Sequence, residues 1–301
     1  MRGKHISKKT DYEYMDIHNC SPKTNIYLNR VGITNVLKPV LIERPTRKVA
    51  LTAKINAYIA LPPEQKGVHM SRSAEVINEI VEESILKPAK SLEELCKDIS
   101  KELLARHEYT DYAETEAEAT YFLERRSGSR NNMESYKLLA RAIAKRNSKV
   151  RKMVGVEVLG MTACPCAMET IRETFMKNKK IDKTPTITHN QRNITTLIIE
   201  VPENYDVEAN NLIEIVESSL SSPTYEILKK NEEGNMVYAA HLNPKFVEDV
   251  VREVLTKVLS FYKNLPDEAL VSVKSISEES IHKHDAFAER ITTMGELRKN
   301  E

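Results

Sequence analysis

The sequence lacks any marked excess of charge. Its 45 basic and 44 acidic residues give a net charge of +1 over 301 residues. Such a balance creates no general attraction to nucleic acid or to an anionic membrane, so a site for a polyanion has to be local. We therefore expect neither nucleic acid nor a membrane among the partners of this chain.

Long apolar runs and abundant cysteine are missing as well. No stretch approaches the roughly 18 consecutive apolar residues of a transmembrane helix, and the start, Met1 to His5, leads into no apolar signal-peptide core. Four cysteines are too few for a disulfide framework, and free thiols suit a reducing compartment. Cys96, on an apolar helical face, is expected in the core. These features predict a cytoplasmic protein.

The chain is long enough for two domains, and its pattern repeats once. Apolar residues alternate from Val49 to Leu61, as in a half-buried strand, and the alternation ends at Pro62. A helix is predicted from about Ser71, and a second starts at Ser91, whose partner Glu94 completes a capping box. Alternation resumes over residues 112–125. With a strand before Val49, this half has the order ββααββ.

The second half is predicted to repeat that order. A strand over residues 193–201 precedes a helix over about 207–220 and another over about 243–262. We expect Asn243 to cap that helix and Pro244 to be its first residue. A strand with Leu270, Val271 and Val273 follows. Residues 230–234 are expected to form a loop between the helices.

The join between the halves is ambiguous, because residues 136–145 fit a strand by alternation and a helix by composition. We choose the strand, which makes residues 150–161 the next one and places Cys164 at its end. The prediction is an α+β protein with domains 1–147 and 148–301, each an antiparallel ββααββ sheet with two helices on one face. Such sheets leave edges that need a partner, which favours a homo-oligomer, a dimer or a tetramer.

Cys164-Pro165-Cys166 is the strongest chemical signal. A cysteine ligates or attacks as its thiolate, and one intervening residue holds two thiols close but pointed apart, so one can bind metal while the other faces a substrate. A buried apolar pair is the alternative, because free cysteine is commonly buried. A metal at His18-Asn19-Cys20 is a weaker possibility, since no further ligand types lie close by in the sequence.

Further polar segments adjoin predicted elements. Residues 188–192 lead into a strand, where loops gather functional groups on a rigid frame. Glu248 is expected in the second turn of the last long helix, and residues 279–285 follow a strand. Each segment also has an ordinary alternative, a solvated acidic loop or an exposed histidine.

Together these residues resemble the type IB GTP cyclohydrolases, including the archaeal branch that opens methanopterin synthesis. The resemblance spans nearly the whole chain and rests on five segments in the family's order: Gly67-Val68-His69-Met70-Ser71-Arg72, Cys164-Pro165-Cys166, His189-Asn190-Gln191-Arg192, Asn243-Pro244-Lys245-Phe246-Val247-Glu248-Asp249 and Glu279-Ser280-Ile281-His282. It implies tandem tunnelling-fold domains that assemble into oligomeric barrels. It also implies a metal held by Cys164, His189 and Glu233, with Glu232 as the rival carboxylate. Thiolate, imidazole and carboxylate suit Fe²⁺, with Mn²⁺ or Zn²⁺ as alternatives.

The resemblance implies a reaction too. The guanine imidazole ring of GTP is opened by water, formate leaves, and a pterin ring closes. Glu279 and His282 would transfer protons, with His284 as a substitute, and Cys166 would contact the purine or shuttle a proton. Glu248 would accept the N1 and N2 hydrogens of guanine.

Positive groups for the triphosphate gather at one predicted helix start. Lys66, His69, Ser71 and Arg72 offer cationic and polar donors where free backbone N–H groups also favour anions. The alternative is that Ser71 only caps and Arg72 is only solvated. Arg192 is a further candidate for substrate binding. Because the phosphate and metal segments belong to different halves, substrate is expected where domains or subunits meet.

The product of the reaction and two remote alternative functions remain to be considered. Segments 161–167 and 185–189 look more like the archaeal branch, which favours 7,8-dihydroneopterin 2′,3′-cyclic phosphate over the triphosphate as product. Remote alternatives are a nitrile reductase of the same fold with Cys166 as nucleophile, and a non-catalytic metal-binding oligomer.

Overall fold

The alternating residues of both halves build one antiparallel sheet in the computed structural model, which describes residues 16–44, 47–127, 130–176 and 185–299. Its strands follow the order β1-β2-β3-β4-β5-β6-β8-β9, and the short β7 pairs with β5. Their bounds are β1 (Leu28–Glu43), β2 (Lys48–Leu61), β3 (Tyr112–Ser127), β4 (Arg130–Lys145), β5 (Arg151–Ala163), β6 (Asn190–Pro202), β7 (Ser222–Pro223), β8 (Leu270–Ser277) and β9 (Ala286–Thr293).

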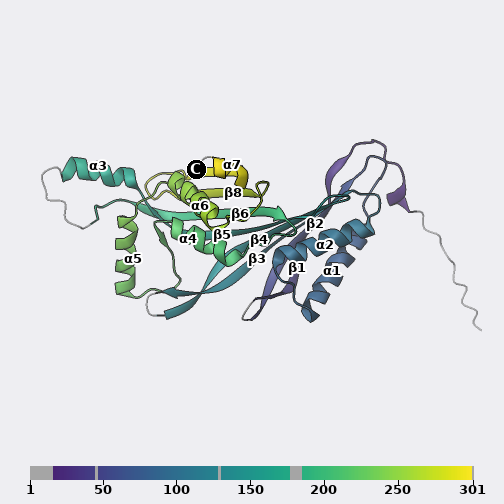
Figure 1. Cartoon of the computed structure of the whole chain (residues 1–301), viewed down its shortest axis with the longest axis horizontal. Helices are drawn as coiled ribbons and strands as arrows, with labels where there is room; N and C mark the ends of the chain where they lie inside the picture. The colour runs from purple at the N-terminus through teal and green to yellow at the C-terminus, as the bar shows by residue number, and fades with distance from the viewer. Residues whose placement is uncertain (1–15, 45–46, 128–129, 177–184, 300–301) are drawn as a thin grey trace, which may run out of the picture.

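Helices connect the strands in the predicted places and in two further ones. They are α1 (Met70–Leu86), α2 (Leu92–Arg106), α3 (Pro165–Phe175), α4 (Ala209–Ser219), α5 (Lys230–Leu242), α6 (Val247–Phe261), α7 (Met294–Lys299) and the 3₁₀ helix η1 (Ile17–Asn19). The Ser91 side chain accepts the N–H of Glu94 and caps α2, as predicted. The α+β fold with a ββααββ order in each half is confirmed, with α3 and α5 added to the second half (Figure 1).

One face of the sheet is apolar from β2 to β8. The register aligns Ile55 with Ala117, Ala117 with Ala140, and Ala140 with Val154. It continues from Val154 to Ile199 and from there to Val271, and all of these residues are buried. Because directly paired residues share a face, the core of both halves lies on one side of the sheet. Helices α1, α2, α4 and α6 pack against it, which leaves the opposite face without them.

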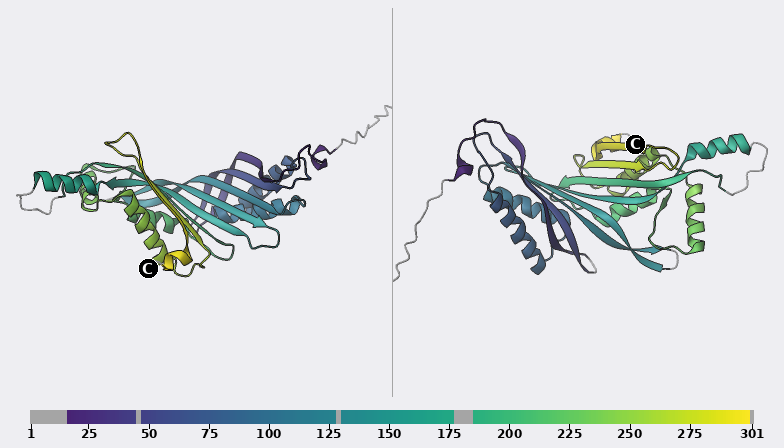
Figure 2. Two further views of the ribbon diagram at one scale, coloured as in Figure 1. Left: turned by 90° about the horizontal axis from the view of Figure 1, so that it is seen from above. Right: turned by 180° about the vertical axis from the view of Figure 1, so that it is seen from behind.

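The ambiguous segment 136–145 is a strand, as chosen. It lies within β4 and alternates buried and exposed residues along its length. The turn at Asn147, with φ of 61°, leads directly into β5, so the sheet runs unbroken across residues 147 and 148. The two views of Figure 2 show β3, β4 and β5 as long neighbours in one twisted sheet. A division into two domains at this turn stays a prediction.

Buried charge joins the helix layers of the two halves. Lys152 on β5 is 2% exposed, and its ammonium donates to Glu94 of α2 at 2.6 Å and to Asp206, before α4, at 2.5 Å. Arg44, after β1, pairs with Glu208 at 2.6 Å. A buried cation needs such partners because the loss of its hydration would otherwise make its burial unfavourable in free energy.

Four local predictions in the second half are wrong: the loop over residues 230–234, Asn243 as cap and Pro244 as first residue of the last long helix, and Glu248 in its second turn. Residues 230–234 are the first turn of α5 rather than a loop, and Asn243 ends α5 instead of capping α6. Helix α6 begins at Val247, so Glu248 lies in its first turn. Asn243 instead donates through Nδ2 to the carbonyl of Leu220 at 3.1 Å, because it stands between two helices rather than at the start of one.

Cys96 is fully buried, and burial raises the pKa of its thiol well above the ordinary value, as expected of a core residue. Among the described residues, none of the helices has the length and apolar character needed to cross a membrane. The segment Met1 to His5, on which the expected lack of a signal sequence depended, lies outside the described residues.

His107 makes the fold sensitive to acid. Its ring, at the end of α2, is fully buried, with Nε2 3.2 Å from Ser73 Oγ and Nδ1 2.9 Å from Tyr109 Oη. Burial, then the nearby charge of Arg72, lowers the pKa of His107 from 6.5 to about 4. Unfolding therefore takes up a proton as the pH falls from about 6.5 toward about 4, and stability falls with it.

We expect wild type to lose on the order of 2 kcal/mol of unfolding free energy from this group between pH 7 and pH 5. Urea unfolding of His107→Gln across this range should show a flatter dependence, and His284→Gln, at an exposed histidine, should keep the wild-type slope. Equal slopes in all three proteins would contradict the assignment.

Candidate active site

Three strand ends meet where the core face of the sheet becomes polar. Cys164 follows β5 and His189 precedes β6, and the Cys164 N–H donates to the His189 carbonyl at 3.0 Å. Next along, Asn193 pairs with Ser277, so Glu279 lies just beyond the end of β8. Since side chains alternate along a strand, Cys164, His189 and Glu279 continue the core-face rows of their strands. We call this place the strand-end corner.

Gln191 connects the residues of this corner. Its Oε1 lies 3.0 Å from His189 Nδ1, while its Nε2 donates to Glu279 Oε1 at 3.2 Å. The other carboxylate oxygen, Glu279 Oε2, is 3.7 Å from His189 Nδ1. Because an amide oxygen only accepts, Nδ1 is the donor in this contact, and in the neutral ring the lone pair is then on Nε2 of His189. This is the tautomer that a metal-binding imidazole needs, with its other nitrogen held by a hydrogen bond.

A network of buried polar side chains on β5, β6 and β8 holds Gln191 in position. Its Nε2 also lies 3.3 Å from Thr162 Oγ1, which is 3.3 Å from Ser277 Oγ. Asn193 Nδ2 donates to both Ser275 and Ser277 at 2.9 Å. Buried polar groups rigidify a site when they are mutually satisfied. The sequence analysis missed these residues, although the replacement of apolar by small polar residues at the core-face positions of three neighbouring strands was a signal for them.

Cys164 caps a helix that the sequence analysis also missed. Its Sγ accepts the Ala167 N–H at 3.5 Å at the start of α3. Cys164 is half-buried and Cys166, in the first turn of α3, is exposed, so the two thiols differ in their access to solvent. Pro165 as the first helical residue was the available signal.

The carboxylates of α5 differ in their use. Glu232 accepts the Lys229 N–H at 2.8 Å and so closes the first turn, whereas the side chain of Glu233 is exposed. Helix α5 is tied to the corner by His241, whose Nε2 lies 3.3 Å from the Thr188 carbonyl. Within the described ranges, the ligand atoms of Cys164, His189 and Glu233 do not all lie within 4.8 Å of one another.

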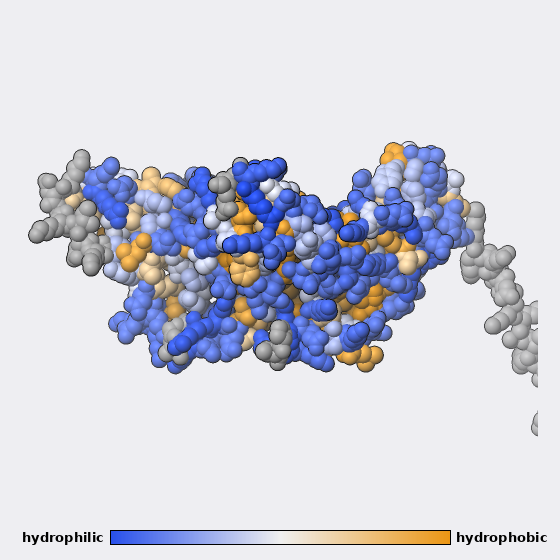
Figure 3. Space-filling model, viewed as in Figure 1, coloured by the Kyte–Doolittle hydropathy of each residue, from blue (hydrophilic) through white to orange (hydrophobic). Residues whose placement is uncertain are grey.

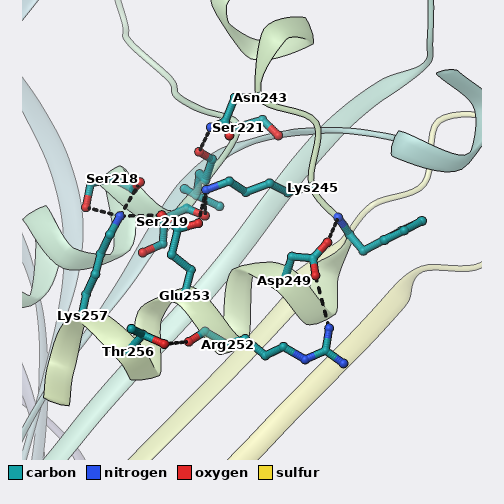
Figure 4. Close-up of polar contacts among 12 residues, drawn as sticks. Ser218, Ser219, Ser221, Asn243, Lys245, Asp249, Arg252, Glu253, Thr256 and Lys257 are labelled. Atoms are coloured by element: carbon teal, nitrogen blue, oxygen red, sulfur yellow. Dashed lines mark hydrogen bonds and ion pairs between the residues drawn. The ribbon is translucent and has the colours of Figure 1, made fainter. Parts of the chain in front are cut away.

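Helix α6 is anchored beside the corner, with Glu248 exposed in its first turn. The Lys245 N–H donates to the carbonyl of Ala163, next to Cys164, at 3.0 Å. The buried Lys245 ammonium donates to the Ser219 carbonyl at 3.1 Å and pairs with Glu253 (Figure 4). These contacts fix the start of α6, and thereby the backbone of Glu248, relative to Cys164.

The residues predicted to transfer protons follow β8 and make different contacts. Glu279 is 13% exposed within the corner. His282 is exposed and stacks on His284, with ring centroids 5.0 Å apart and an interplanar angle of 16°. The structure therefore brings Glu279 to His189 and pairs His282 with His284.

The anion cluster, Lys66, His69, Ser71 and Arg72, lies at the other end of the molecule from the strand-end corner. It surrounds the start of α1, whereas the corner adjoins α3 and α5, and both figures show these elements at opposite ends (Figures 1 and 2). Lys66, Ser71 and Arg72 are exposed. Burial, then the charge of Arg72, lowers the pKa of His69, so this ring favours its neutral form.

Arg192 lies on the opposite face of the sheet from Gln191. It lines a cavity of about 630 Å³ together with Glu278, Lys54 and Lys137, on the face that the helices leave uncovered. One chain thus separates three sets of predicted site residues: the strand-end corner with α6, the anion cluster, and Arg192.

Comparison with known proteins decides the family. Residues 14–288 match the family model described as type I GTP cyclohydrolase folE2. The chain belongs to this family. GTP cyclohydrolase MptA of Methanosphaera stadtmanae is 41% identical over 305 residues, which cover 95% of this chain and 97% of that protein. GTP cyclohydrolase MptA of Methanocaldococcus jannaschii is 39% identical over 302 residues, covering 94% and 96%. The predicted family and the prediction of a C–N hydrolase are confirmed.

Solved structures support the fold alone. Uricase from Arthrobacter globiformis aligns with a TM-score of 0.55 at 7% identity, covering 88% of this chain and 93% of the uricase. A hyper-thermostable uricase mutant gives a TM-score of 0.57 at 9% identity, covering 88% of this chain and 92% of the mutant. The tunnelling fold expected from the sequence is thereby confirmed.

We expect Gln191→Leu to weaken metal binding at the strand-end corner about 10- to 100-fold, because His189 loses the partner that orients its ring. Isothermal titration with Mn²⁺ would measure this, with circular dichroism to check the fold. Thr196→Val is the matched control, since Thr196 lies on the same strand but faces the opposite side of the sheet. Unchanged affinity in Gln191→Leu would remove Gln191 as a positioning residue.

Proposed function

We propose that this GTP cyclohydrolase opens the guanine imidazole ring of GTP at the strand-end corner, releases formate and forms 7,8-dihydroneopterin 2′,3′-cyclic phosphate. The family match over residues 14–288 supports the reaction class. The meeting of Cys164, His189 and Glu279 at one end of the core face supports the location. The relatives named GTP cyclohydrolase MptA come from methanogens, which supports methanopterin synthesis as the pathway.

We assign a divalent metal, most consistent with Fe²⁺ and with Mn²⁺ or Zn²⁺ as alternatives, to Cys164, His189 and Glu233. The donor set fits such an ion: the thiol caps a helix, and His189 presents Nε2 with Nδ1 held by Gln191. Glu233 is preferred to Glu232 because the Glu232 carboxylate already accepts the Lys229 N–H. When bound, the metal supplies Lewis-acid chemistry that lets water act as a nucleophile near neutral pH.

The residues of the chain then bind the purine and move protons. One water adds at C8 and the C8–N9 bond breaks to leave a formamide on N7. A second water attacks the same carbon and the C8–N7 bond breaks, which releases formate, and each nitrogen that leaves carbon takes up a proton. Glu279, which accepts a hydrogen bond from Gln191, would exchange protons in the corner. The exposed His282 would exchange protons with the ribose-derived chain. Cys166 faces outward from the first turn of α3 to contact the purine.

The separation of the site residues supports a site completed by a second copy of the chain. The anion cluster and the strand-end corner lie at opposite ends of one chain, so the phosphates and the guanine of one GTP would be bound by different copies (Figure 1). Strands β1 and β9 end the sheet and carry exposed apolar side chains, among them Leu37, Phe287 and Ile291. Edge strands of this kind pair readily with another chain. The face visible in Figure 3 is largely hydrophilic, with apolar residues scattered among the charged ones.

Formation of the cyclic phosphate requires that the triphosphate be held close to its α-phosphate, where the reaction takes place. A ribose hydroxyl attacks the α-phosphorus, the bond from that phosphorus to the bridging oxygen breaks, and pyrophosphate leaves while the hydroxyl proton passes to a base. Lys66 and Arg72 would stabilise the charge on the leaving pyrophosphate. The same ring opening without this step would yield the triphosphate.

Phosphorus NMR of an anaerobic reaction tests the product. With Fe²⁺-loaded protein and GTP, we expect one formate and one pyrophosphate per turnover, together with a cyclic phosphodiester signal. An intact triphosphate on the pterin would contradict the cyclic product while leaving the ring opening in place. Absence of formate and of a pterin chromophore would contradict the function itself.

We expect Glu248→Gln to raise the KM for GTP at least about tenfold, because an amide presents a donor where the carboxylate accepts both guanine hydrogens. Metal content should stay at the wild-type level. Glu214→Gln, at an exposed glutamate of α4, is the control and should behave as wild type. Steady-state kinetics with an unchanged KM and kcat would exclude Glu248 as the guanine anchor.

A further inference from the structure

A second group of metal-ligand side chains lies beside the anion cluster. Asp16, His18 and His69 each offer one ligand atom, and these atoms all lie within 4.8 Å of one another. Asp16 Oδ1 is 3.4 Å from His18 Nδ1, and Asp16 Oδ2 is 3.7 Å from His69 Nε2. The rings of His18 and His69 are 4.7 Å apart between centroids. We call these residues the His-Asp triad.

Hydrogen bonds hold the triad in place and still leave lone pairs on its ligand atoms free to bind a cation. The Gly67 N–H donates to the His18 carbonyl at 3.3 Å, and the Lys66 N–H donates to the Cys20 carbonyl at 3.1 Å. These backbone bonds fix η1 against the loop that precedes α1. The Asp16 carboxylate accepts the His18 N–H at 3.1 Å and the Asn19 side-chain amide at 2.6 Å, which leaves lone pairs on both oxygens.

His69 supplies the observation that points to a ligand. Its Nε2 is buried and has no hydrogen-bond partner among the described residues, and the Asp16 oxygen nearest to it is too far for a hydrogen bond. Leaving a buried polar nitrogen unpaired costs roughly 1–3 kcal/mol. The ring fills no capping role either, although His69 stands at the N-cap position of α1. A cation between His69, His18 and Asp16 would satisfy all three side chains.

The chemistry of the surroundings also favours a cation. Asp16 places a negative charge next to His69, in the region that Lys66 and Arg72 make suitable for phosphate. An uncompensated carboxylate there would repel a phosphate group, whereas a bound divalent cation reverses the local charge. Two imidazoles and one carboxylate suit a borderline transition ion, and three protein ligands leave a position open for an exogenous oxygen.

We propose that the His-Asp triad is a second divalent-metal site, separate from the strand-end corner, and that its open position ligates a phosphate oxygen. The phosphate part rests on the proposed function, because it takes the anion cluster as the phosphate site. The metal part does not depend on it.

Cobalt distinguishes the two sites, because a thiolate ligand adds an intense charge-transfer absorption in the near ultraviolet and a nitrogen–oxygen site does not. Metal-free Cys164→Ser protein should still bind about one Co²⁺ per chain, with visible bands and no thiolate absorption. Adding His18→Ala to this variant should weaken Co²⁺ binding at least about tenfold. Glu64→Gln in the same background removes a nearby exposed carboxylate outside the triad and should leave binding unchanged.

Failure of folded Cys164→Ser protein to bind Co²⁺, or equal binding with and without His18, would overturn the site. Inorganic phosphate tests the open position. It should shift the visible Co²⁺ bands of the Cys164→Ser protein, and Arg72→Gln should weaken that shift while keeping the cobalt. Bands that do not respond to phosphate would overturn the phosphate part. If the triad binds Co²⁺ but the wild-type protein forms no pterin from GTP, the proposed function is wrong and the second metal site still stands.

Discussion

The register of the sheet is the constraint on which the site depends. From β2 to β8 the antiparallel strands keep the same face toward the helices. Side chains alternate between the two faces, so a register shift of one residue would move a strand's apolar side chains from the core to the solvent-exposed face. The same rows continue past the apolar core into Gln191, and then to His189, Glu279 and Cys164. The core that stabilises the protein thus also sets the spacing of the candidate catalytic groups.

The transition from core to site is gradual. Thr162, Asn193 and Ser277 occupy core-face positions between the apolar residues and the strand-end corner, and they bond to one another while buried. Such a network keeps Gln191 in one orientation, since each alternative would leave a buried group unpaired. It provides rigidity at the corner without the conformational freedom of a loop.

The opposite face of the sheet, which the helices leave uncovered, carries ion pairs instead of an apolar core. Arg141 of β4 pairs with Glu200 of β6 at 2.8 Å, and Arg30 of β1 pairs with Glu116 of β3 at 2.6 Å, so each pair reaches across the strand between them. The charges on this face are largely matched locally, which agrees with the small net charge of the chain. Lys66 and Arg72 of the anion cluster are exposed, and within one chain the sheet separates this cluster from the strand-end corner.

The sequence alone determined the elements and the chemical types of the site. Alternation identified β2, β3, β4 and β8, and the motifs around Cys164 and His189 predicted which residues are candidate ligands, because a local period and a residue type are properties of short segments. The tertiary structure decided what no short segment contains. It showed that residues 230–242 form a helix, that Gln191 joins His189 to Glu279, and that His69 lies against Asp16 and His18. These contacts depend on strand register and on the packing of η1 against the loop before α1, which bring together residues far apart in the chain.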